Sequence, residues 1–321
     1  MSNRVGYVLG STFHPRELVP VARAVEEHGF SSIWSTEDYF ATGGIAGAAT
    51  VLQATEEIRV GTGLVSVYAR HPGLLAMEAG TIASVHPGRF VLGVGVGGLW
   101  WLDQQGIAHR RPLGAVRGTI EAVRALWAGE TLTGEYGGFT FDGVHLEFPP
   151  SEPPPIHLGA TGPKMTALAG EVSDGLLLSV FSSPAFVRVE RDIMAANGGA
   201  DTPITTLAFL ALAESTAEAR ARIRPMLGSF LADGESSAMT DALGITDELR
   251  ALAQKGGPKG LAAEMPDEWI DQLCVCGDVD ACVAQIHALL EAGSDEVALA
   301  PVHADSLLGD IQKLGTALSA G

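Results

Sequence analysis

The chain has 321 residues and a formal net charge of −18, with 46% hydrophobic and 18% charged residues. This composition is typical of a globular protein with a large core and argues against disorder. A surface this acidic repels nucleic acid and anionic lipid, so we expect neither nucleic acid nor a membrane as a partner.

Three cysteines, Cys274, Cys276 and Cys282, lie close together near one end of the chain. An odd number in a short segment is a poor disulfide framework, and a zinc site would need the usual CxxC pair and a further ligand. We therefore expect reduced thiols, a cytoplasmic protein and no bound metal. No stretch approaches the roughly 20 uninterrupted apolar residues of a membrane helix, and the first residues contain no apolar leader.

Short apolar runs alternate with amphipathic segments along most of the chain. The first run, Val5–Gly10, predicts a buried strand, and Pro15 opens a helical pattern that closes at Gly29. The alternation predicts eight strands, which begin near residues 5, 31, 58, 90, 156, 174, 204 and 296. Further helices are expected over 45–52, 74–85, 116–127, 163–172, 184–196, 216–231, 278–291 and 304–318. Regular alternation implies parallel strands with crossover helices, and eight units predict an α/β fold of the (β/α)8 TIM barrel type.

Two longer gaps between the strands predict insertions. Residues 131–148 alternate in polarity and contain Gly137-Gly138 and Asp142-Gly143, which indicates a β-hairpin; this insertion extends over about 131–153. A less regular stretch predicts a helical insertion near 234–272. No segment has the character of an interdomain linker, so we expect one domain over 1–321.

The active site of such a barrel lies at the carboxyl ends of the strands. This rule selects the connections at 10–14, 35–40, 62–70, 94–101 and 160–164. The fourth contains Gly93-Val94-Gly95-Val96-Gly97-Gly98, which matches GxGxxG. A dinucleotide fingerprint would follow the first strand and have an acid about 20 residues on, so we reject that interpretation. Either close approach of a flat ligand or a plain tight turn explains these glycines.

The loop Gly159–Lys164 joins a strand to a helix. Free N–H groups at a helix start, with Thr161 and Lys164 nearby, predict a phosphate site. The GK[ST] ending of a P-loop is missing. The alternative is ordinary capping with Pro163 in the first turn.

Two adjacent acids, Glu37 and Asp38, follow the second strand. Carboxylates at the catalytic face predict general acid or base chemistry, whereas a solvated capping pair is the alternative. His14 also lies in such a connection, and His71-Pro72 is expected only to start a helix. The chain has no GxSxG elbow and no HExxH motif. We also find no converging His and Asp ligands that would indicate a metal-dependent hydrolase.

Taken together, these connections resemble the luciferase-like monooxygenase superfamily, and within it the deazaflavin branch that includes methylenetetrahydromethanopterin reductase. The resemblance runs in order over nearly the whole chain. The stretches that carry it are Ile33–Phe40, Gly61–Pro72, Gly88–Gly95 and Leu158–Lys164, the last followed by Ala169-Gly170-Glu171.

The resemblance implies a barrel, usually dimeric, that holds coenzyme F-420 or FMN at its carboxyl mouth. It implies a non-proline cis peptide at Gly63–Leu64 that bulges against the cofactor ring, with Glu37 facing the cofactor and two loops holding its tail and phosphate. The cofactor-binding residues that it implies are Glu37, Gly63, Leu64, Val65, Gly95, Val96, Gly97, Gly98, Ala160, Thr161, Gly162, Pro163 and Lys164.

The chain departs from the pattern of this superfamily at three positions. The family often has a histidine where this chain has Asp38. Methanopterin reductases carry a glutamate at the position of Val8, and the related sugar-phosphate dehydrogenases carry an acid at the position of Gly98. Neither substrate assignment therefore transfers to this chain.

These observations predict an F-420-dependent oxidoreductase that transfers a hydride between the deazaflavin and a small organic substrate. Asp38 is the candidate proton donor or acceptor, with Glu37 and His14 as further catalytic candidates. An apolar pocket is expected from Tyr39, Phe40, Trp100 and Trp101. The alternatives are an FMN-dependent monooxygenase and, because the usual histidine is missing, a non-catalytic cofactor-binding barrel. We expect a homodimer.

Overall fold

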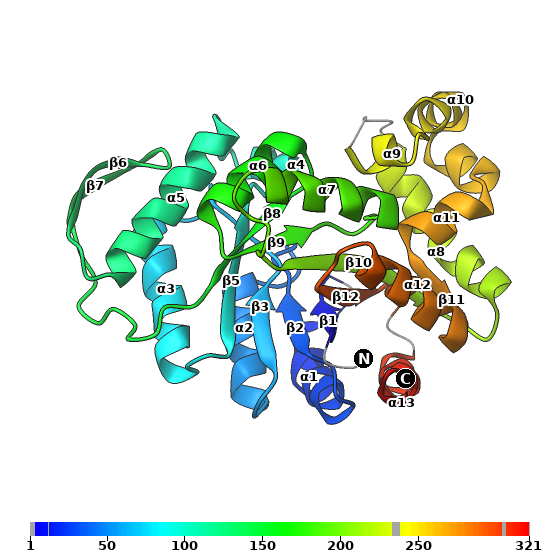
Figure 1. Cartoon of the computed structure of the whole chain (residues 1–321), viewed down its shortest axis with the longest axis horizontal. Coiled ribbons are helices and arrows are strands. Elements are labelled where there is room, and N and C mark those ends of the chain that lie inside the picture. The colour runs from blue at the N-terminus through cyan, green and yellow to red at the C-terminus, as the bar shows by residue number, and fades with distance from the viewer. Residues whose placement is uncertain (1–3, 12, 233–237, 304–305, 321) are drawn as a thin grey trace.

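Eight parallel strands close into a ring in the computed structural model, which describes residues 4–11, 13–232, 238–303 and 306–320 (Figure 1). Neighbouring strands pair around the ring, and the last pairs with the first through Val5 and Val297. In order, the strands are β1 (Val5–Leu9), β2 (Ser32–Ser35), β3 (Arg59–Thr62), β5 (Phe90–Gly95), β8 (Ile156–Ala160), β9 (Gly175–Leu178), β10 (Ile204–Leu212) and β12 (Glu296–Pro301). Each begins within one residue of its predicted position, so the predicted (β/α)8 barrel is confirmed.

Helices cover the outside of the ring (Figure 1). In chain order, these helices include α1 (Leu18–Glu27), α2 (Gly44–Ala54), α3 (Pro72–Val85), α5 (Pro112–Trp127), α6 (Pro163–Val172), α7 (Pro184–Ala196), α12 (Val279–Glu291) and α13 (Leu307–Ala320). Four of these helices begin with proline, whose fixed φ suits the first helical position and whose missing N–H would have no partner there. The predicted start of the last helix, residue 304, lies outside the described residues.

Both predicted insertions contain the expected kind of element. A hairpin of β6 (Leu132–Tyr136) and β7 (Phe139–Val144) lies at one edge of the molecule (Figure 1). Its Thr140 carbonyl is 3.2 Å from Nε2 of His71, whose other ring nitrogen caps α3, as expected from His71-Pro72. The helical elements at the opposite edge are α8 (Thr216–Leu231), α9 (Ala238–Ala242), α10 (Thr246–Glu264) and α11 (Asp267–Leu273).

Three short elements escaped prediction. They are β4 (Val65–Ser66), α4 (Leu99–Gln104) and β11 (Val275–Gly277). A strand of two or three residues carries too little periodicity to be seen in a sequence. The expected short helices near 234–272 include one long element, α10, which Gly257 interrupts with a φ of 58° just before Pro258. Residues 233–237, where that insertion was predicted to begin, lie outside the described part of the chain.

The indole of Trp34 lies at the centre of the barrel interior, with the buried His157 ring 5.7 Å away. The indole of Trp34 packs with Val8, Val91, Leu177 and Leu207. A Cβ placed at Gly61 would lie 2.4 Å from the Trp34 ring, so only glycine leaves room for the indole there. At the amino end of the barrel, the Trp34 Nε1–H group donates to Glu296 at 3.3 Å.

Gly93 lets two barrel strands approach each other. A Cβ at this position would lie 1.8 Å from the Thr62 carbonyl oxygen and 2.9 Å from Leu177 Cδ1. The Gly93→Ala variant should therefore force β3 and β5 apart and lower the free energy of unfolding by about 2 kcal/mol, measured by urea denaturation. Gly114→Ala is the matched control, because nothing lies within 4 Å of that Cβ and alanine favours the helix. Equal stability of the two variants would contradict this account.

Candidate functional site

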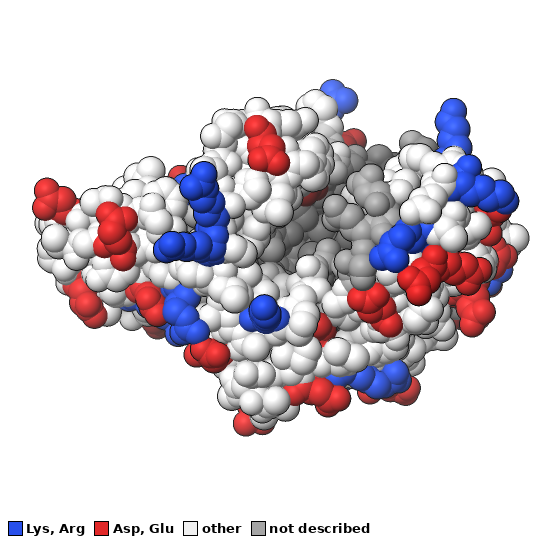
Figure 2. All heavy atoms as spheres, turned by 90° about the horizontal axis from the view of Figure 1, so that it is seen from above, with Lys and Arg blue, Asp and Glu red and all other residues white. Residues whose placement is uncertain are grey.

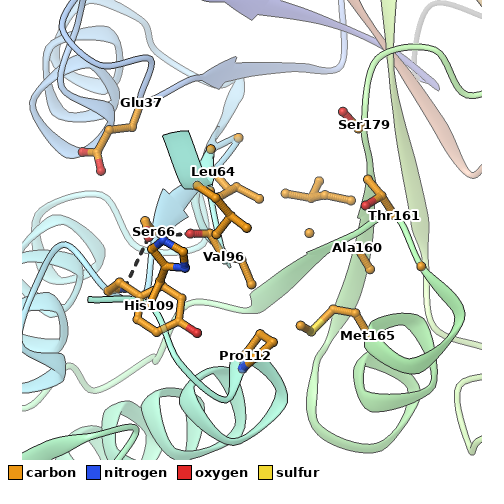
Figure 3. Close-up of a pocket in the computed structure, with 18 of the residues that line it drawn as sticks. Glu37, Leu64, Ser66, Val96, His109, Pro112, Ala160, Thr161, Met165 and Ser179 are labelled. Atoms are coloured by element: carbon orange, nitrogen blue, oxygen red, sulfur yellow. Dashed lines mark hydrogen bonds between the residues drawn. The ribbon is translucent and has the colours of Figure 1, made fainter. Parts of the chain in front are cut away.

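A cavity of about 960 Å³ opens at the carboxyl ends of the strands. Its walls come from the connections after β2, β3, β5 and β8, from the end of β9 and from Leu207 within β10 (Figure 3). Figure 2 shows this face hollowed near its centre. Most predicted site residues line the cavity, namely Glu37, Asp38, Gly63, Leu64, Val96, Gly97, Gly98, Ala160, Thr161, Gly162, Pro163 and Lys164.

Glu37 is held by a bidentate ion pair at the cavity wall. Arg70 donates from both terminal nitrogens to the two carboxylate oxygens, at 2.7 and 2.6 Å, while only 3% of the Glu37 side chain is exposed. The Tyr39 hydroxyl donates to Oε1 at 3.2 Å, and burial together with the Glu37 charge raises the pKa of that hydroxyl. Both oxygens of Glu37 are therefore engaged by donors, and Arg70 also forms an ion pair with Glu78 at 3.3 Å.

Asp38 is placed differently from its neighbour. Its Oδ2 accepts hydrogen bonds from the Ser11 backbone N–H at 2.9 Å and from the Thr36 hydroxyl at 2.8 Å. A Cβ built on Gly10 would lie 3.3 Å from the same oxygen, so the carboxylate lies over the end of β1. No Lys or Arg in the described part of the chain forms an ion pair with it. Asp38 thus presents an unbalanced carboxylate to the cavity.

A bulge after β3 forms the floor of the cavity. The Gly63–Leu64 peptide bond is cis, as the resemblance implied, and Tyr39–Phe40 is a second non-proline cis bond. Cβ atoms at Gly95 and Gly159 would lie 2.7 and 2.1 Å from Leu64 Cδ2, so these glycines of β5 and β8 leave the space that the leucine fills. Gly63 packs against Trp34, since a Cβ placed on Gly63 would lie 3.3 Å from the Cβ of Trp34. The barrel interior thus supports the bulge from below.

The loop after β8 leads directly into α6 at the cavity wall. Gly162 is the N-cap residue, no side chain caps the helix, and Pro163 occupies its first turn. The first N–H groups of a helix have no partners within it, and the helix dipole is positive at this end. Lys164 is exposed and has no acidic partner among the residues described. These features fit an anionic group better than ordinary side-chain capping does.

Comparison with known proteins identifies the family to which the chain belongs. The chain matches the family description "Luciferase-like monooxygenase" over residues 1–296. The chain belongs to the luciferase-like monooxygenase family.

Proteins that resemble the chain include enzymes whose names state F-420 dependence. The 5,10-methylenetetrahydromethanopterin reductase of Methanolobus tindarius is 29% identical over 287 residues, which cover 86% of this chain and 87% of that protein. The F-420-dependent glucose-6-phosphate dehydrogenase of Nakamurella multipartita is 32% identical over 200 residues, or 57% of this chain and 58% of that protein. A solved F-420-dependent tetrahydromethanopterin reductase from Methanopyrus kandleri shares the fold, with a TM-score of 0.84, 20% identity and 97% of each chain covered.

Some residues predicted for this luciferase-like site lie outside the cavity wall. Val65 is buried in β4, and Gly95 lies beneath Leu64 rather than at the surface of the cavity. His14 is exposed, and its Nδ1 accepts the Arg16 N–H at 3.2 Å to cap a short 3-10 helix. Of the expected aromatic pocket, Tyr39 and Trp101 line the cavity, whereas Phe40 and Trp100 are 74% and 59% exposed.

Sequence reasoning missed one histidine of the cavity wall. The Nε2 atom of His109 lies 2.8 Å from Asp103 Oδ1, and the ring faces Tyr68 edge-on at 6.3 Å (Figure 3). Asp103 lies in α4 and His109 lies between α4 and α5, both beyond the strand-end segment 94–101 on which prediction relied. Their spacing of six residues would have been the only signal in the sequence.

The three cysteines lie apart from this cavity. All are free and buried, and burial raises the pKa of Cys276 and Cys282 to about 12, so both remain protonated thiols. Among the described residues, no group of three or more His, Cys, Asp or Glu side chains could hold a metal ion. Within the same ranges, no helix is both long and apolar enough to cross a bilayer.

Proposed function

We propose that this protein is a coenzyme F-420-dependent oxidoreductase that acts on a small organic molecule. The observation that carries the proposal is the pairing of the Gly63–Leu64 bulge with the α6 N-terminus around one cavity. A cavity of about 960 Å³ is at the upper end of the range for ligand sites, so it has room for a cofactor ring and a second molecule. The name of the Nakamurella multipartita relative supports the same cofactor.

The residues present fit such a cofactor. The bulge offers an apolar floor for a flat ring, and Gly97, Gly98 and Gly162 let a ligand approach the backbone closely. Thr161 and Lys164 would hold a phosphate at the start of α6. When bound, the deazaflavin supplies hydride transfer. The chain contributes the orientation of both partners and the proton that balances the charge, which we assign to Asp38, because both oxygens of Glu37 are engaged by Arg70.

Cofactor titration tests the proposal directly. Purified protein is titrated with F-420 and, separately, with FMN, and binding is followed by quenching of tryptophan fluorescence. Trp101 lines the cavity and reports on it. Tight binding of F-420 with weak binding of FMN is expected. The reverse result would favour the FMN-dependent monooxygenase, and cofactor binding without turnover of a broad substrate panel would favour the non-catalytic barrel.

Lys164 offers a sharper test of how the cofactor is oriented. The Lys164→Ala variant removes the cation at the α6 N-terminus and should weaken F-420 binding about tenfold, because a charge-assisted contact with phosphate is lost. The loss should shrink as salt concentration rises. Lys259→Ala, an exposed change on α10, is the control and should leave the affinity unchanged. Equal affinities for the two variants would place the phosphate elsewhere.

The proposal includes a homodimer and a cytoplasmic location. The reduced, buried cysteines are compatible with that location. Sedimentation of the purified protein would decide the oligomeric state.

A further inference from the structure

Charge is distributed unevenly around the cavity. Four of its side chains, Glu37, Asp38, His109 and Lys164, can carry charge near neutral pH. Glu37 is paired with Arg70, which also contacts Glu78, and His109 is paired with Asp103. Lys164 lies at the α6 end, which the proposed function assigns to the cofactor phosphate. Asp38 therefore carries the only charge left for a substrate to meet among the described residues of the wall.

The remaining wall is apolar. Leu177, Leu178 and Leu207 line it from β9 and β10, and Ser179 follows β9. Leu207 Cδ1 would lie 3.8 Å from a Cβ on Gly63, so this apolar wall adjoins the bulge. Ser179 lies across the cavity from Glu37, with Leu64 between them (Figure 3).

No cation serves this part of the cavity. Among the residues described, Lys164 is the one Lys or Arg that lines the wall. The remaining residues of the chain (1–3, 12, 233–237, 304–305 and 321) include neither lysine nor arginine in their sequence. An anionic group bound beside Leu207 would therefore lose its hydration without gaining a partner, and it would be repelled by Asp38.

We propose that the substrate of this site is uncharged and apolar around its reacting carbon, and that the site rejects phosphorylated and carboxylated compounds. This inference rests on the proposed function, because that function commits Lys164 to the cofactor. Rejection arises from the missing cation and from the unbalanced Asp38 carboxylate. An uncharged compound instead gains from burial against the leucines of β9 and β10 and against Tyr39 and Trp101.

The test uses two probes of nearly equal shape, para-acetylbenzoate and its methyl ester. Their dissociation constants are measured by ligand-observed NMR with the F-420-loaded protein and with the cofactor-free Lys164→Ala variant. The variant lacks the wall's one cation, so it reports the charge preference even if F-420 does not bind. The ester should bind at least about tenfold more tightly than the carboxylate in both samples, a difference of about 1.4 kcal/mol.

A charge swap provides the second arm. Ser179 is only partly buried at the end of β9, so longer side chains can reach solvent there. Ser179→Lys should reduce the preference for the ester about tenfold, whereas Ser179→Gln, of similar length and uncharged, should preserve it. Equal binding of carboxylate and ester by the unmodified cavity would overturn the inference, as would identical behaviour of the two Ser179 variants. Failure of F-420 to bind would instead contradict the proposed function.

Discussion

Replacing Asp38 by asparagine is expected to lower kcat by about 10²–10⁴-fold for any substrate that the protein turns over. The asparagine oxygen can still accept from the Ser11 N–H and the Thr36 hydroxyl, so the local fold should be retained. What is lost is the group to which we assign proton transfer. F-420 affinity should stay within about threefold, because the bulge and the α6 loop are untouched.

A second readout distinguishes this role from a structural one. In Asp38→Asn, kcat should fall while F-420 affinity and unfolding free energy stay near the wild-type values. Asp142→Asn, the same chemical change on the exposed hairpin, is the matched control. If Asp38→Asn kept the wild-type kcat, or lost F-420 binding as strongly as kcat, the proton-transfer role would be refuted.

Replacing Arg70 by alanine should cost about 3 kcal/mol of unfolding free energy, at the low end for a broken buried pair because 24% of Arg70 is exposed. The Glu37 carboxylate would remain buried, with only Tyr39 and the Gly44 N–H as donors. F-420 binding should weaken as well, because Glu37 and Tyr39 form one wall of the cavity.

Two further variants isolate the cause. Adding Glu37→Gln to Arg70→Ala should restore part of the stability, because burying a neutral amide without a cation costs less free energy than burying a carboxylate without one. Arg250→Ala removes an arginine from an exposed pair with Asp247 and should change stability by less than about 0.5 kcal/mol. Urea unfolding measures all three variants, and an Arg70→Ala protein as stable as Arg250→Ala would disprove the argument.

The barrel could be predicted because each of its strands is a short apolar run bounded by glycine, proline or a helical pattern. Position then selected residues of the cavity wall, since Asp38 lies in the connection after β2 and Lys164 lies in the first turn of α6 after β8. The pairing of Glu37 with Arg70 joins residues 33 apart and depends on how β2 and β3 lie side by side. Likewise, nothing in the glycine run indicates that Gly95 makes room for Leu64. Such contacts are set by tertiary packing, which one sequence without relatives does not reveal.

β10 is the longest strand of the barrel, and its two halves have different neighbours. Its first part pairs with β9 at Ile204–Thr206, and its last residues, Leu210–Leu212, pair with β11. One continuous strand therefore joins the ring to the region of α8 and α11. Movement of that region as a rigid body would break the main-chain hydrogen bonds between β10 and β11 or would bend β10 itself. We therefore expect ligands to enter and leave the cavity without rigid-body closure of this region over it.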